Sequence, residues 1–129
     1  MRATLLRLQN EWETVQASHD RMAIYQYLTA VFETVSCWEH EGRAVKRAGR
    51  ALHLRGHDSV REPEPFASII GCTSDPDKVD ARMRSKWSRV LRYAAEFKDP
   101  DDPLGDFVKR QGGINKCAAR FARRLARHR

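Results

Sequence analysis

The side chains best suited to chemistry in this sequence are cations that recur at helical spacing in its second half. On a helix over 114–128, with about 100° per residue, four of them share one face: Lys116, Arg120, Arg123 and Arg127. The opposite face is apolar and consists of Ile114, Cys117, Ala118, Phe121 and Leu125. Such a ridge of positive charge is suited to binding phosphate groups, the repeated anions of nucleic acids.

A second cationic row belongs to the helix that we expect to begin at Asp75. Its apolar face consists of Val79, Met83, Trp87, Val90, Ala94 and Phe97, and four cations flank it: Lys78, Arg82, Lys86 and Arg89. A third row, on an earlier helix, contains Arg43, Lys46, Arg47 and Arg50. Tyr93 lies at the edge of the second row, in position to stack on a base or sugar. The predicted nucleic-acid-binding residues are Arg82, Lys86, Arg89, Tyr93, Lys116, Arg120, Arg123, Arg124 and Arg127. The sequence leaves open whether the three rows converge.

Two pairs of residues have the spacing of metal ligands. They are Cys37 with His40, and His53 with His57. Zinc needs four converging ligands, and Gly56 is expected to end the helix within the second pair, which disrupts the alignment of the two histidines. We therefore predict no metal site.

The remaining candidates for catalysis lack the partners that catalysis requires. We expect Cys37 to pack beside Trp38, and Cys72 and Cys117 to be buried structural thiols. Gly112-Gly113 lacks the Lys-Ser/Thr ending of a P-loop. We predict no catalytic residue and no cofactor, and so a protein that is not an enzyme.

The charge of the chain is unevenly distributed. The 129 residues have a formal net charge of +7, yet residues 1–65 contain nine basic and nine acidic side chains. The whole excess therefore lies in residues 66–129. No apolar run suits a signal peptide or a membrane span, and three cysteines do not form a disulfide framework. Composition thus argues against secreted, membrane and collagen-like classes and predicts a cytoplasmic protein.

Apolar residues recur every three to four positions through most of the chain, and no alternating strand pattern is present. The expected helices cover 2–17, 20–55, 66–72, 75–98, 104–111 and 114–128. The second segment forms one long helix or, alternatively, breaks near Gly42, since glycine inside a helix costs about 1 kcal/mol relative to alanine. A loop over His57–Pro65 separates neutral scaffold helices, 1–56, from a basic helical half, 66–129. We predict an all-α bundle of five to six helices in a single domain, 1–129, with one long helix in its N-terminal half.

The end of the chain is predicted to form a basic αα-hairpin. A short helix, the glycine turn and residues 112–119 (GGINKCAA) together resemble the opening of the helix-turn-helix in Fis-like bacterial DNA-binding proteins. The resemblance covers about 20 residues and includes no second turn and recognition helix before Arg129. We therefore expect contacts to the phosphate backbone rather than groove reading by a recognition helix.

These patterns predict a non-enzymatic accessory or regulatory protein that binds DNA or RNA, or a small helical subunit of a nucleoprotein complex. The alternative is an inhibitor or adaptor of phage or plasmid type, whose basic face binds an acidic or nucleic-acid-binding surface of another protein. A solvated face without a ligand and a frayed basic tail are the simplest explanations of the same charges. Trp12 is expected in the core, or at a contact with a protein partner or a second copy of the chain. No membrane partner is expected.

Overall fold

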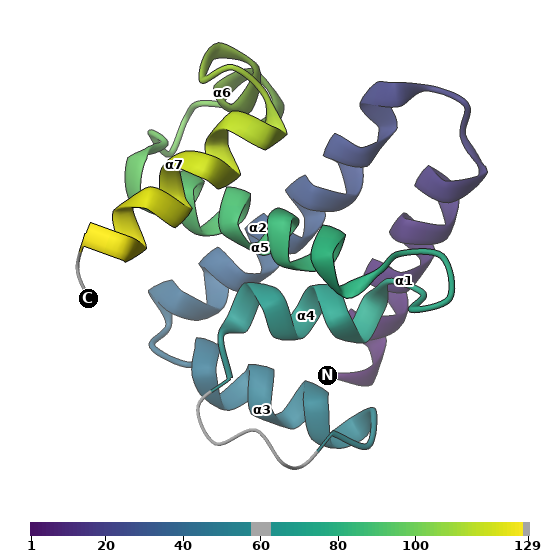
Figure 1. Cartoon of the computed structure of the whole chain (residues 1–129). Coiled ribbons are helices and arrows are strands. Elements are labelled where there is room, and N and C mark those ends of the chain that lie inside the picture. The colour runs from purple at the N-terminus through teal and green to yellow at the C-terminus, as the bar shows by residue number, and fades with distance from the viewer. Residues whose placement is uncertain (58–62, 128–129) are drawn as a thin grey trace.

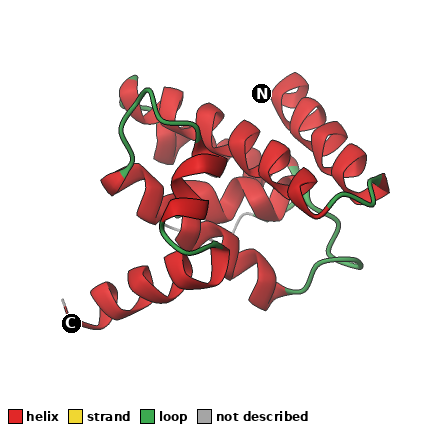
Figure 2. Cartoon of the chain, turned by 90° about the horizontal axis from the view of Figure 1, so that it is seen from above, coloured by secondary structure: helices red, strands yellow, loops and turns green. Residues whose placement is uncertain are grey.

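The computed structural model describes residues 1–57 and 63–127, and these form seven α-helices and one short 3₁₀ turn (Figure 1). The helices are α1 (Arg2–Ala17), α2 (Ile24–His40), α3 (Ala44–Leu54), α4 (Pro65–Thr73), α5 (Ala81–Phe97), α6 (Leu104–Arg110) and α7 (Ile114–Arg127). The 3₁₀ turn, Arg21–Ala23, precedes α2. Figure 2 shows that helices joined by loops make up the described parts of the chain, with no strand among them. The prediction of an all-α fold is confirmed.

The predicted long helix is wrong, because the chain turns at Gly42 and starts a new helix. Gly42 has a φ of +71°, a backbone conformation that side chains with a Cβ rarely adopt. Its N–H donates to the carbonyl of Glu39 at 3.0 Å, and the N–H of Arg43 donates to that of Trp38 at 2.8 Å. These two bonds form a Schellman motif, which satisfies the last carbonyls of α2. The break raises the helix count to seven, above the predicted five to six.

The predicted start of α5 at Asp75 is also wrong. Asp75 closes a single turn by accepting the N–H of Asp77 at 2.9 Å. Asp80 accepts the N–H of Met83 at 2.8 Å and is the true N-cap, so α5 begins at Ala81. Because Asp80 rather than Asp75 caps the helix, α5 begins later and is shorter than the sequence indicated.

One apolar core contains residues from all seven helices. The three tryptophans are buried in it, as predicted: Trp12, Trp38 and Trp87. Tyr27 of α2 is fully buried, and its hydroxyl lies 2.6 Å from the Thr73 hydroxyl of α4. Thr73 itself donates to the carbonyl of Ile69 at 2.8 Å, so Tyr27 must be the donor of the first bond. Burial raises the pKa of Tyr27, which keeps the phenol protonated as this bond requires.

α2 and α4 lie at the centre of the helix packing. α4 packs against α3 and also against α5, whereas α2 contacts α1, α3, α4, α5 and α6. In Figure 1, α3, α4 and α5 accordingly follow one another from the bottom of the view upward. The predicted loop His57–Pro65 lies partly outside the described residues, but Gly56 follows α3 with a φ of +81°, and Pro65 is the first residue of α4. The predicted end of the last helix at His128 also falls outside them.

The connection between α6 and α7 depends on two adjacent glycines. Gly112 and Gly113 both have a φ of +101°, which reverses the chain within three residues. A Cβ added at Gly112 would collide with the side chain of Lys116. After this turn α7 packs chiefly against α5, and its contact with α6 is smaller. α7 is thus attached to the fold mainly through α5, and its contact with α6, which the expected αα-hairpin would provide, contributes less.

Candidate nucleic-acid interface

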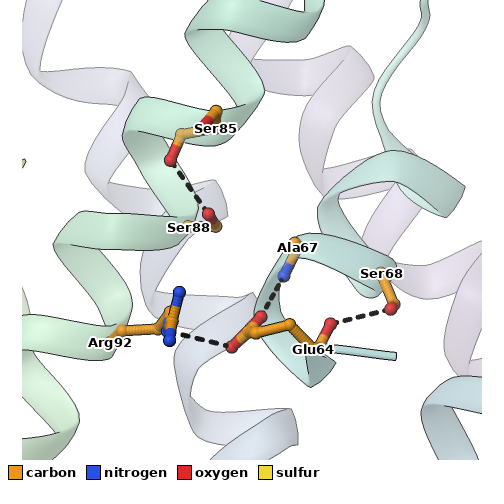
Figure 3. Close-up of polar contacts among 6 residues, drawn as sticks. All are labelled: Glu64, Ala67, Ser68, Ser85, Ser88 and Arg92. Atoms are coloured by element: carbon orange, nitrogen blue, oxygen red, sulfur yellow. Dashed lines mark hydrogen bonds and ion pairs between the residues drawn. The ribbon is translucent and has the colours of Figure 1, made fainter. Parts of the chain in front are cut away.

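Arg92 of α5 holds together the helices on which the candidate interface is built. Its guanidinium lies 4.6 Å from the centre of the Phe121 ring of α7, and Phe121 is buried. Its Nε lies 3.7 Å from a carboxylate oxygen of Glu64, the N-cap of α4, whose other oxygen accepts the N–H of Ala67 at 2.7 Å (Figure 3). Burial raises the pKa of Glu64, although Arg92 and the capping N–H act in the opposite direction. Arg92 therefore fixes α7 against α5 and α5 against α4.

Two of the predicted phosphate-binding arginines also have partners within the chain. Arg124 of α7 forms an ion pair with Glu96 of α5 at 2.6 Å, and its guanidinium lies 4.9 Å from the centre of the Phe97 ring. Arg120 donates to the main-chain carbonyl of Gln111 at 2.8 Å and to its side-chain oxygen at 2.7 Å. Both side chains remain part-exposed, but their first role is to attach α7 to its neighbours.

Three cations of α7 have no such partner. Lys116, Arg123 and Arg127 are exposed and form no hydrogen bond or ion pair with any residue that the structure describes. They lie on the outer side of the helix, away from the buried Cys117 and Phe121. In Figure 2 the C-terminal end of α7 extends clear of the other helices. These three side chains are therefore open to an external anion.

The cations of α5 that the sequence analysis selected lie on the N-terminal side of Arg92. Arg82 is exposed, whereas Lys86 and Arg89 are half-buried, and the three form no ion pair among the described residues. The Nε of Arg89 is itself buried without a hydrogen-bond partner in that part of the chain. Three carboxylates precede the helix, at Asp75, Asp77 and Asp80. The positive potential of α5 is therefore expected to be stronger around Lys86 and Arg89 than around Arg82.

The exposed aromatic ring of this region is Phe97, which the sequence analysis placed on the apolar face. Tyr93 is half-buried, its ring centre lies 4.9 Å from that of Phe97 and 6.0 Å from that of Phe107, and its hydroxyl donates to Gln111 at 3.3 Å. Phe97 is 49% exposed, and Leu125 of α7 is also exposed. The expectation that Phe97 belongs to a packing face is therefore wrong for about half of the residue, whereas most of Leu125, at 37% exposure, is covered.

The reason is a rotation of the buried face of α5. Ser88 and Leu91 are buried together with Trp87, Val90 and Ala94, so the centre of that face lies further round the helix than the apolar residues named from the sequence indicated. Met83 and Phe97 then fall at its edge, where Met83 is 41% exposed. Leu91 gives a hydropathy signal for part of this rotation, which the sequence analysis missed, whereas the small buried Ser88 gives none.

The third cationic row lies on a different surface. It belongs to α3, which packs against α4, α2 and α1. Arg47 forms an ion pair with Glu41 at 3.4 Å and lies over the Trp38 ring, while Arg43, Lys46 and Arg50 are exposed. α4 lies between α3 and α5, so the row of α3 lies apart from the rows of α5 and α7, which belong to two helices in contact. We call the cations of α5 and α7 together the α5–α7 surface, and the row of α3 the α3 surface.

The structure corrects one of the three cysteine predictions. Cys72 and Cys117 are buried, as expected, but Cys37 is exposed, with its thiol 3.4 Å from a carboxylate oxygen of Glu41. This neighbouring carboxylate raises the pKa of Cys37, which disfavours the reactive thiolate. Cys37 lies on the side of α2 away from the buried Val35 and Trp38, so its thiol is exposed to solvent. Within 1–57 and 63–127, no three His, Cys, Asp or Glu side chains are grouped to hold a metal ion.

A cavity of about 820 Å³ lies between α2 and the segment that connects α5 to α6. Phe32 and Leu104 contribute apolar surface to it, and four residues contribute carboxylates: Glu33, Glu39, Asp101 and Asp102. A groove with four carboxylates repels polyanions, so we do not include this cavity in the candidate interface.

Comparison of the chain with protein-family models, with curated proteins and with solved structures finds no match. Among the helices of the described residues, none has the length and the apolar composition needed to cross a membrane.

Proposed function

We propose that this protein is a non-enzymatic nucleic-acid-binding accessory or regulatory protein that contacts the phosphate backbone through the α5–α7 surface. One observation carries the proposal: α7 has no acidic residue, buries its apolar face against α5 and leaves Lys116, Arg123 and Arg127 exposed and unpaired among the described residues. Like charges on one helix face repel each other, and a phosphate backbone relieves that repulsion. The free cysteines Cys37, Cys72 and Cys117 support a reducing, cytoplasmic location.

The surface supplies a defined number of phosphate contacts. Its unpaired cations are Arg82, Lys86, Arg89, Lys116, Arg123 and Arg127, whereas Arg120 and Arg124 are engaged within the chain. Six contacts with duplex DNA give a slope of about −5 for the logarithm of the association constant against the logarithm of salt concentration. The affinity is therefore expected to fall about 10³-fold between about 50 and 200 mM salt.

The test compares two triple variants with the same change in charge. In the first, Lys116, Arg123 and Arg127 of α7 are replaced by Gln; in the matched control, Arg43, Lys46 and Arg50 of α3 are replaced by Gln. All six side chains are exposed in the native protein. Labelled duplex and single-stranded oligonucleotides are titrated at several salt concentrations, and thermal unfolding checks that both variants fold.

The α7 variant should lose about 10²–10³-fold in affinity for duplex at about 0.1 M salt, with a slope about 2.7 smaller, because three contacts are removed. The α3 control should retain the affinity and slope of the wild type. Equal losses in both variants would mean that net charge alone governs binding. Absence of binding by the wild-type protein at low salt would overturn the proposal and favour the alternative, in which the same surface binds an acidic protein.

A further inference from the structure

We infer that Phe97 is a stacking platform for an unpaired base, so that the ligand favoured by the α5–α7 surface is a single-stranded nucleic acid. This inference rests on the proposed function and specifies its substrate class. The sequence indicated Tyr93 as the stacking residue, whereas we assign this role to Phe97, four positions further along α5.

Phe97 combines exposure with fixed support. Half of the residue is open to solvent, although it is a large apolar side chain at the end of α5. The guanidinium of Arg124 lies over its ring at 4.9 Å, and the ring of Tyr93 lies beside it at the same distance, tilted by 44°. A ring held in this way keeps its orientation before a ligand arrives, which lowers the entropic cost of stacking.

The charges around the ring suit a phosphate backbone. Arg123 and Arg127 lie within one turn of Arg124 on α7 and have no partner among the described residues. Glu96, the acidic residue before Phe97, forms an ion pair with Arg124, and Asp102 forms one with Arg110. Asp99 and Asp101, in the segment that follows α5, are exposed, so the cations that favour a phosphate backbone are those on the α7 side of the ring. Cations that track a backbone beside an exposed aromatic ring are the usual combination in proteins that bind single strands.

A duplex offers this ring no comparable contact. Its bases are stacked on each other and paired, so a ring at a helix end can reach a base face only if the base is unpaired or extruded. The phosphates of a duplex remain available to the same cations. The structure thus predicts that single strands gain a base-dependent contribution on top of an electrostatic one.

The probe that isolates this contribution is a single-stranded DNA of about 20 thymidines, compared with a strand of equal length and charge in which every nucleotide is abasic. Both strands are titrated with the wild-type protein and with Phe97→Ala, Phe97→Leu and Phe97→Trp. Leu6→Ala is the matched control, because Leu6 is an exposed apolar residue of α1, at 57% exposure. Sedimentation of each protein records its oligomeric state.

The wild-type protein should bind the thymidine strand roughly 5- to 100-fold more tightly than the abasic strand. Phe97→Ala and Phe97→Leu should abolish this preference while binding the abasic strand as the wild type does, since their charge is unchanged. Phe97→Trp should retain the preference and show quenched fluorescence on binding, and Leu6→Ala should behave as the wild type.

Equal affinity of the wild type for both strands would overturn the inference and leave the proposed function intact. The same holds if Phe97→Ala keeps the preference, or if the variant changes only the oligomeric state, which would assign the ring to contact with a second copy. If the wild type binds neither strand and no duplex at low salt, the proposed function itself fails.

Discussion

Arg123 and Arg124 are adjacent in α7, yet the structure assigns them different tasks. Arg124 is occupied by Glu96 and by the Phe97 ring, whereas Arg123 is exposed and unpaired within the described residues. The informative perturbations are the single change Arg123→Gln and the double change Glu96→Gln with Arg124→Gln. The single change removes one free cation, and the double change removes the ion pair without altering the net charge.

The double variant should be less stable. An exposed ion pair contributes about 0.2–1 kcal/mol, and the side chains of Arg124 and Glu96 are 41% and 42% exposed, so screening keeps the value within that range. The cation–π contact with Phe97 adds about 0.5–1 kcal/mol. The sum, about 0.7–2 kcal/mol, corresponds to a decrease in Tm of about 3–7 °C for a chain of this length. Its salt slope with duplex DNA should equal that of the wild type.

The single variant should show the reverse pattern. Loss of one phosphate contact reduces the slope for duplex by about 0.9 and the affinity at about 0.1 M salt by about 8-fold. Its Tm should remain within about 2 °C of the wild-type value, because surface substitutions away from specific contacts change stability by less than about 0.5 kcal/mol. Thermal unfolding and fluorescence anisotropy at four salt concentrations measure both quantities. A single variant that unfolds as early as the double one, or a double variant with the smaller slope, would refute the assignment.

Two further predictions concern groups outside the α5–α7 surface. A thiol reagent should modify Cys37 in the native protein, faster as pH rises because Glu41 raises the pKa of this thiol, and should reach Cys72 and Cys117 only after unfolding, since these two are buried; modification of three thiols in the native protein would contradict the packing described. The second concerns Glu64, whose pKa is raised above 4.5 by burial. Its contribution to stability is therefore fully present below about pH 4.5 and is lost as pH rises through the pKa of the folded state. Urea unfolding from pH 4 to 7 should therefore show the wild type losing stability relative to Glu64→Gln as pH rises; a relative gain would mean that Arg92 and the helix cap outweigh desolvation.

Much of the helical framework could be predicted because its signals are local. Pro65 opens α4, Gly56 follows the end of α3, and the glycine pair before α7 permits its sharp turn. The amphipathic pattern of α7 also identified which of its faces is buried, since Cys117 and Phe121 are buried as predicted. Capping residues and periodicity act over a few positions, so they can be recognised without knowledge of tertiary contacts.

The candidate site was less predictable because its properties depend on neighbouring helices. Arg120 and Arg124 have the same sequence pattern as Arg123, and only the positions of Gln111 and Glu96 distinguish a cation that supports the fold from one that is free. The difference in exposure between Tyr93 and Phe97 has the same origin, because Tyr93 packs against Phe107 of α6 and donates to Gln111, whereas Phe97 is half exposed.

The turn at Gly42 sets the cations of α3 apart from those of α5 and α7. By ending α2 and starting α3 in a new direction, it places Arg43, Lys46 and Arg50 on the side of α4 away from α5. A short strand that occupies the α5–α7 surface leaves those charges unneutralised, whereas a long or second strand can fill them. A single glycine in the neutral half of the chain thus keeps Arg43, Lys46 and Arg50 from adding to the α5–α7 surface.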